Sequence, residues 1–264
     1  MNIRKTVRNL SNTEVTNIRN AYKTMMGLRD TRGYNYIAGQ HGIPGNHCLH
    51  HERFFTNEPN ARLFLPWHRA YLYTFELYVQ DAGNNNEIAV PWWDWTSKLS
   101  RKEGIPKVFA DKSVGGMPNP LFSYHMKVPE SQSPRRPLDE DTKRDPGSAS
   151  RLPTLQMVNR LYSIVDYGDF SDQLEQVHDA IHGWVGESMS EVDTAAFDPI
   201  FWSHHCMIDR IWWIWQLKNG NPTSGIPSSL LDVVLAPFSL KVRDVLNIYQ
   251  LGYDYASTRV SVAF

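Results

Sequence analysis

The stretch DPIFWSHHCMIDRIWWIWQ, residues 198–216, combines a histidine pair with a long apolar and aromatic run. It predicts a helix that begins near Pro199, which suits the first turn, and ends at 219–220 (Asn-Gly). The helix carries two adjacent histidines, His204 and His205. Because adjacent helical residues point about 100° apart, only one of them can face an ion held by another helix. The other must have a structural role.

A second histidine pair precedes this helix in the sequence HDAIH, where His178 and His182 are four residues apart. The segment has helical periodicity, so both rings project from one face and can grip a single ion. Alone, the pair is equally compatible with ordinary histidines in the core or at the surface. The sequence is not HExxH, so the general-base glutamate of zinc proteases is missing and hydrolysis of that kind is disfavoured.

Apolar periodicity and capping signals predict the other helices. They span residues 12–29, opening with a capping box of Ser11 and Glu14, then 66–83, 170–184 and about 239–250. The expected fold is therefore mainly α, with a four-helix bundle core and long irregular loops. The polar residues 130–150 are expected to form a surface excursion and not a domain linker, because histidines on both sides of it are needed together.

Bulk properties exclude several classes of function. The 264 residues carry a formal net charge of -1 without basic clusters, so neither nucleic acid nor an anionic membrane is an expected partner. A small, nearly neutral molecule fits better. No export signal or membrane span is recognisable, so we expect a soluble or cytoplasmic protein. The two cysteines, Cys48 and Cys206, cannot make a disulfide framework, and the oligomeric state stays open.

Nearly all the histidines fall into two windows, and His125 alone stands apart. The first window holds His41, His47, His50, His51 and His68, and the second holds His178, His182, His204 and His205. Sites made of imidazole alone suit copper, zinc, iron or nickel. Two three-histidine sites facing each other would form a binuclear centre in the core of a helix bundle.

At these residues the chain resembles the tyrosinase, catechol oxidase and haemocyanin family, the type 3 copper proteins, and among them the short bacterial-type tyrosinases. The resemblance rests on FLPWHRAYLYTFE (64–76), PWWDW (91–95), HDAIHGWVG (178–186), DPIFWSHHCMIDRIWWIWQ (198–216) and LGYDY (251–255). It implies one catalytic domain, 1–264, with a surface loop at about 128–150 and no C-terminal shielding domain. An enzyme active without proteolysis is expected.

The resemblance also implies the ligands of two copper ions. The first would be held by His41, His50 and His68, the second by His178, His182 and His205, with His204 as a neighbour. The middle ligand of the first ion is the open choice, because the family position nine residues before His68 is Pro59. His50 is favoured over His51, since Cys48-Leu49-His50 resembles the C-x-H thioether arrangement of some members. An ordinary thiol at Cys48 is equally compatible.

The implied activity is ortho-hydroxylation of monophenols and oxidation of o-diphenols to o-quinones, with dioxygen as co-substrate, as in melanin biosynthesis. The resemblance places Phe201 over the site, Val192 against the substrate ring, and Asp179 and Glu175 where a carboxylate could take the phenol proton. Core packing, loop packing and solvated carboxylates are the alternative readings. Buried ion pairs of Asp209, Arg210 and Arg69 would fix the ligand helices.

Other functions remain open from the sequence. A catechol or o-aminophenol oxidase without monophenol hydroxylation is the nearest alternative. An oxygen carrier similar to haemocyanin belongs to a different class, and the short chain argues against it. A zinc or iron hydrolase is a third possibility. Metal analysis and paired assays of a monophenol and its diphenol separate these readings.

Overall fold

Helix α8 (Ile200–Lys218) is the most deeply buried element of the protein in the computed structural model, which describes residues 1–43, 62–132, 137–220 and 225–258. Every residue from Ile200 to Gln216 is buried, as expected for a helix that is apolar on all sides. The Asp198 side chain accepts a hydrogen bond from the Ile200 amide, 3.0 Å away, and so satisfies a donor at the start of the helix.

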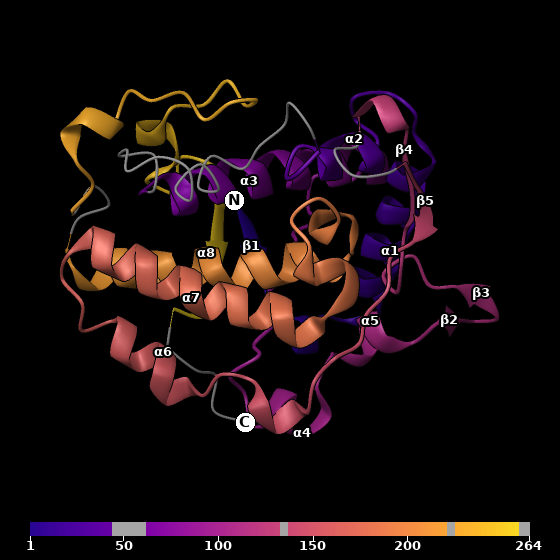
Figure 1. The fold of residues 1–264 in the computed structure, drawn as a ribbon, viewed down its shortest axis with the longest axis horizontal. Coiled ribbons are helices and arrows are strands. Elements are labelled where there is room, and N and C mark those ends of the chain that lie inside the picture. Colours follow the sequence, from indigo (N-terminus) through magenta and orange to yellow (C-terminus); the bar gives the residue numbers. More distant parts are fainter. Residues whose placement is uncertain (44–61, 133–136, 221–224, 259–264) are drawn as a thin grey trace.

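Three further helices complete a four-helix bundle with α8. They are α1 (Asn12–Gly27), α3 (Phe64–Gly83) and α7 (Tyr167–Val185). Helix α3 contacts α1, α7 and α8, and α7 also contacts α8. In Figure 1, α7 and α8 run side by side across the middle of the view, with α3 above them. The expectation of a mainly α fold with a four-helix core is confirmed.

The ends of these helices follow the local capping chemistry. The capping box at the start of α1 is present, with Ser11 and Glu14 bonded to each other's backbone amides. Helix α3 begins two residues before Pro66 and ends at Asn84, whose backbone is left-handed with φ 45°. Helix α7 starts earlier than expected because Asp166 caps it through the Asp169 amide. The bundle helices therefore differ from prediction only at their ends.

The helix expected at 239–250 was wrong. Only a single 3-10 turn, Val242–Val245, forms there. The carbonyl of Val245 accepts from Arg69 Nη1 at 2.9 Å, and that of Leu246 accepts from Gln216 Nε2 at 3.0 Å. These carbonyls accept hydrogen bonds from side chains of α3 and α8, so they do not point along a helix axis as the i to i+4 bonds of an α-helix require.

Short elements connect the bundle helices. They are α2 (Tyr34–Gly39), α4 (Ser100–Glu103), α5 (Lys107–Ala110), α6 (Leu155–Leu161), and the 3-10 turns Val7–Asn9, Glu130–Gln132, Ala149–Arg151, η6 (Glu187–Ser190), η7 (Ala195–Phe197) and Ser228–Leu230. Helices α2 and α6 were not expected from the sequence. Both are too short to show a clear apolar period.

Three small two-stranded sheets complete the structure. Strand β1 (Asn2–Arg4) pairs in parallel with β6 (Tyr253–Tyr255), Asn2 opposite Tyr253. Strands β2 (Ser113–Val114) and β3 (Met117–Pro118) form one hairpin. Strand β4 (His125–Val128) pairs antiparallel with β5 (Leu138–Asp141). The β1–β6 pair joins segments from opposite ends of the sequence beside α3 and α8.

The described part of the polar excursion lies mostly at the surface, but several of its residues are bonded to or buried against the rest of the fold. Leu138 is buried in β5, and Arg144 forms a salt bridge with the buried Asp198 just before α8. This segment therefore helps to anchor the start of the central helix. Within the described ranges, no helix is both long and apolar enough to cross a membrane.

Candidate metal centre

Three histidine nitrogens converge where α7 and α8 face each other. The Nε2 atom of His205 lies 3.3 Å from that of His178 and 3.4 Å from that of His182. Two nitrogens that each lie about 2.0 Å from a shared ion at tetrahedral angles are about 3.3 Å apart. The spacing therefore fits three imidazoles around one metal ion, and the four-residue separation on α7 produces it.

The outer nitrogen of each α7 histidine is already bonded. His178 Nδ1 lies 2.9 Å from a carboxylate oxygen of Asp179, and His182 Nδ1 lies 2.6 Å from the Met189 carbonyl. An acceptor at Nδ1 places the proton there and leaves the Nε2 lone pair facing inward, as a metal ligand requires. These hydrogen bonds at Nδ1 thus fix both the tautomer and the ring direction.

The cluster is held in the neutral, ligating form. Burial lowers the pKa of His182 to about 4. Burial, followed by the charges of neighbouring imidazoles, lowers the pKa of His205 and His204 well below the ordinary value. Neutral imidazole at physiological pH keeps its lone pair, so the donor set suits a borderline metal such as copper or zinc.

His204 joins the same cluster. One ligand atom from each of the four histidines 178, 182, 204 and 205 lies within 4.8 Å of all the others. The ring of His204 stacks 5.2 Å from that of His178, and its two ring nitrogens are buried without a hydrogen-bond partner among the described residues. Among the described residues, His204 therefore has no hydrogen bond that orients its ring, unlike His178 and His182.

The two described histidines of the first window lie next to this cluster. The ring of His68 stacks on His205 with centroids 4.3 Å apart, and the His41 ring lies 5.6 Å from His68. His68 Nδ1 is 2.9 Å from the Phe64 carbonyl of its own helix, and His41 Nδ1 is 2.9 Å from the Val192 carbonyl. The structure therefore brings together five of the six histidines expected to bind metal.

The sixth, His50, lies outside the described residues. The same holds for His47, His51 and Cys48, so the choice between His50 and His51 and the thioether at Cys48 stay predictions. Cys206, by contrast, is buried in α8 with a free thiol that contacts the Val90 carbonyl.

A cavity of about 210 Å³ opens beside the histidines. Its described lining contains His41, His178, Asp179, His182, Gly183, Met189, Ser190, Glu191, Val192 and Ala195. Asp179 is largely exposed there, with 64% of its side chain accessible, and Val192 is 43% exposed. A Cβ atom added at Gly183 would meet no atom of the described residues within 4 Å, so none of them closes the entrance at that point.

Two other predicted site residues lie behind this lining. The fully buried Phe201 ring is 4.1 Å from the His205 ring and 5.0 Å from the His41 ring. Glu175 is buried one turn before His178 on α7 and is not among the described lining residues. Of the two carboxylates, only Asp179 thus faces the cavity directly.

A buried network joins the helices that carry the histidines. Asp209 on α8 forms salt bridges with Arg69, next to His68 on α3, and with Arg4. The hydroxyl groups of Tyr253 and Tyr255 donate to the same carboxylate. The expected Asp209–Arg69 pair is confirmed, whereas the Arg210 guanidinium stacks 4.1 Å over Trp92 and donates to the Ser257 carbonyl.

The sequence did not reveal the backbone groups that orient the rings. The carbonyls of Met189 and Val192 leave no signal in side-chain identity, although both follow the HDAIH motif closely. The Phe64 carbonyl, four residues before His68, was missed as well, because the predicted helix began only at Pro66. Gly42, directly after His41, was not singled out from the sequence, although an added Cβ there would meet the backbone of Val192.

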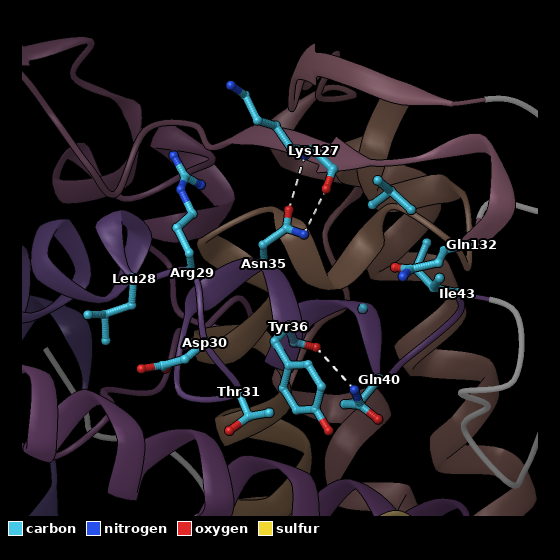
Figure 2. A pocket seen from close by; sticks show the side chains of 12 residues that line it. Leu28, Arg29, Asp30, Thr31, Asn35, Tyr36, Gln40, Ile43, Lys127 and Gln132 are labelled. Carbon is cyan, nitrogen blue, oxygen red and sulfur yellow. Dashed lines mark hydrogen bonds between the residues drawn. The ribbon is translucent and has the colours of Figure 1, made fainter.

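A larger hollow of about 720 Å³ runs along α2 and is shown in Figure 2. There Asn35 bonds both the amide and the carbonyl of Lys127, and Gln40 donates to the Tyr36 carbonyl. None of the described residues that line it is histidine or cysteine. Metal chemistry therefore belongs to the smaller cavity beside the histidine cluster.

Comparison with known proteins identifies the architecture. Residues 31–218 match the common central domain of tyrosinase. A-type hemocyanin of Enteroctopus dofleini, units Ode to Odg, is 30% identical over 93% of this chain, which spans 21% of that protein. The sequence thus covers about a fifth of this relative's length.

Solved structures agree with the sequence match. A functional unit of octopus hemocyanin superposes with a TM-score of 0.80 at 25% identity, covering 98% of this chain and 69% of that one. Tyrosinase of Burkholderia thailandensis superposes with a TM-score of 0.79 at 20% identity, covering 100% and 76%. The second likeness shows a shared fold.

Proposed function

The chain belongs to the type 3 copper family of tyrosinases and hemocyanins, and from that premise we propose that it is a dicopper phenol oxidase. It hydroxylates monophenols at the ortho position and oxidises o-diphenols to o-quinones with dioxygen. His178, His182 and His205 hold one ion, and His41, His68 and His50 hold the other.

The convergence of the three Nε2 atoms at 3.3 and 3.4 Å carries this proposal. It is supported by the inward direction of the rings of His41 and His68, whose Nδ1 atoms are bonded to backbone carbonyls. When bound, the copper pair supplies the binding and reduction of dioxygen. The protein supplies orientation, an aromatic site and proton transfer.

The cavity supplies the aromatic site. It lies against three of the proposed ligands and no described residue closes it at Gly183, so a phenol ring can approach the ions edge-first. Val192 offers an apolar side chain at the entrance, while Phe201 packs between His41 and His205 and limits movement of both rings. Restricting the reactive geometry in this way lowers the entropic barrier.

Asp179 supplies the proton acceptor. Its Oδ1 atom bonds His178, and its exposed carboxylate lies in the cavity where a phenol hydroxyl would arrive. Glu175 is buried one turn earlier on the same helix. A positioned general base contributes about 10²- to 10⁴-fold to a rate, so monophenols, which must lose a proton to react, depend on Asp179 more than diphenols do.

Paired assays test the proposal. The copper-loaded chain is given a monophenol and the matching o-diphenol, and Asp179→Asn is assayed beside it. We expect turnover of both substrates, with monophenol hydroxylation lowered about 10²-fold in the variant and diphenol oxidation lowered much less. Asp81→Asn, on the last turn of α3, is the surface control. Turnover of the diphenol alone by the unmodified chain would reduce the function to catechol or o-aminophenol oxidation.

A second candidate, reversible oxygen carriage, is favoured by the hemocyanin relatives at about 30% identity. It predicts dioxygen uptake that is reversed under vacuum, without consumption of any phenol. The open cavity favours the oxidase, because a carrier has no need of access for an aromatic ring. Metal analysis of the same sample completes the test, since two zinc or iron ions per chain would contradict both candidates.

A further inference from the structure

One short segment reaches both halves of the metal centre. Residues 186–193 follow α7 and include the 3-10 turn η6. The Met189 carbonyl of this segment accepts from His182 Nδ1 at 2.6 Å, and the Val192 carbonyl accepts from His41 Nδ1 at 2.9 Å. These two histidines are proposed ligands of different ions. The other described ligands with a bonded Nδ1, His68 and His178, use groups of their own helices.

The shape of this segment is set by its own backbone. Gly186 and Glu187 both have left-handed conformations, with φ of 74° and 49°. A Cβ at Gly186 would lie 2.7 Å from the Asp145 carbonyl oxygen, so the turn packs closely against the backbone of the segment that follows β5. The Ser188 carbonyl accepts from Thr194 Oγ1 at 2.8 Å, which closes the segment on itself. The two carbonyls that orient the histidines are therefore held in a fixed relation.

The His41 side of this arrangement depends on a glycine. A Cβ added at Gly42 would lie 2.3 Å from the Val192 carbonyl oxygen and 2.8 Å from the Asp193 Cα. Both are backbone atoms, which cannot swing aside as the end of a flexible side chain can. Gly39, three residues earlier, differs in this respect, because its added Cβ would meet Ile43 Cγ1 at an ordinary 3.5 Å.

We infer that residues 186–193 and Gly42 form a clamp that sets the two copper sites relative to each other. The inference rests on the proposed dicopper function. The clamp directs the Nε2 atoms of His41 and His182 toward the ions through one rigid piece of backbone. Loss of such an outer hydrogen bond typically lowers metal affinity about 10- to 100-fold. Because the same segment also lines the cavity through Ser190 and Glu191, the substrate entrance and both sites share one support.

Matched glycine variants test the clamp. Gly42→Ala forces Val192 and His41 apart, so we expect the copper content to fall from two toward one per chain. The remaining isolated Cu(II) should give a paramagnetic resonance signal that the coupled pair lacks. Gly39→Ala should keep two coppers and the spectrum of the unmodified chain. Thermal denaturation of the metal-free proteins checks that both variants fold.

A third variant decides the matter if Gly42→Ala does not fold. Thr194→Val removes the hydroxyl that closes the segment but touches neither histidine. We expect it to weaken binding of both coppers severalfold in competition with a chelator. Unchanged affinity in Thr194→Val, or two tightly held coppers in folded Gly42→Ala, would overturn the clamp. Fewer than two coppers in the unmodified chain would instead contradict the proposed function, and two coppers without phenol turnover would leave the clamp standing.

Discussion

The two halves of the metal centre are built in different ways. The half formed by His178, His182 and His205 stands on two long helices, α7 and α8, that pack directly against each other. The half that contains His41 and His68 combines one long helix, α3, with the turn after α2. Helix periodicity fixes the first arrangement, whereas loop geometry fixes the second.

Helix periodicity makes one half of the metal site predictable from the sequence. Two histidines four residues apart on an apolar-striped helix must share a face, and α8 is buried so fully that one of its two histidines has to meet them. No comparable rule places His41, whose ring is directed by the Val192 carbonyl, 151 residues away in sequence. We therefore expect the helical half to be the more robust and the loop half to be the more easily altered.

The largest expected effect comes from breaking the helical half. His205→Ala removes the nitrogen that lies within 3.4 Å of both partners. It should abolish the second copper and lower phenol turnover at least about 10³-fold, since the metal supplies the redox chemistry. His204→Ala is the matched control, one residue away in the same buried helix. Copper analysis should find two ions in it. Equal copper loss in both variants would contradict the assignment of His205 alone as the ligand on α8.

The next test concerns the loop half of the centre, whose third ligand, His50 or His51, lies outside the described residues. His50→Ala should lower the copper content from two to one per chain, while His51→Ala, its neighbour in the CLHH sequence, should keep two. The reason is the resemblance of Cys48-Leu49-His50 to the family's C-x-H arrangement. The reverse result would move the ligand to His51 without changing the function. Two coppers in both variants would show that this half is completed by another residue.

The fold was more accessible from the sequence than the site. The capping box at Ser11 and Glu14, the stripe of α7 and the apolar length of α8 were sufficient for the bundle. The histidine partners of α7 and α8 followed from the same periodicity. The acceptors at Met189 and Val192 could not be predicted, because backbone carbonyls have no sequence signature. The failed helix at 239–250 has a similar cause, since its carbonyls bond Arg69 and Gln216 across long sequence separations.

The buried Asp209 network, which joins α3 and α8, can be tested by measuring the free energy of unfolding. Burial raises the pKa of Asp209, but the charges of Arg69 and Arg4 and the Tyr255 hydroxyl outweigh it, so the pKa lies below its ordinary value. Asp209→Asn leaves two buried guanidinium groups without this partner and should lower the free energy of unfolding by about 3 to 5 kcal/mol. Thermal denaturation should show a midpoint lowered by about 6 to 20 °C.

The pH dependence of this stabilisation follows from the direction in which the pKa of Asp209 is shifted. A carboxylate with a lowered folded pKa stabilises the protein above its unfolded pKa, and the benefit is lost as pH falls through the folded pKa. The loss of unfolding free energy caused by Asp209→Asn should therefore be complete at neutral pH and should shrink below about pH 4. Asp232→Asn, an exposed partner of Lys241 and Arg243, should cost less than about 1 kcal/mol at any pH. An equal loss in both variants would contradict the role of the buried network.

The smallest expected effect concerns the support of the loop half. His125 on β4 lies 2.8 Å from Asp139 through Nε2 and 2.8 Å from Asp141 through Nδ1, both on β5. Two donating ring nitrogens require the charged imidazolium, and these hydrogen bonds raise the pKa of His125. The same hairpin holds α2 through Asn35, which bonds the backbone of Lys127. Helix α2 leads directly to His41.

The folded pKa of His125 is raised. The charged ring therefore stabilises the β4–β5 pair fully at pH values below the unfolded pKa, near 6.5. This stabilisation is lost as the pH rises through the folded pKa. Hydrogen exchange of the β4–β5 amides, corrected for intrinsic rates, should therefore speed up a few-fold between pH 6 and pH 9. The α2 amides should follow weakly, and the amides of α7 and α8 should not respond. In His125→Gln the pH dependence should disappear. A response of α7 and α8 equal to that of the hairpin would mean that the two halves open as one unit, which would remove the contrast between them.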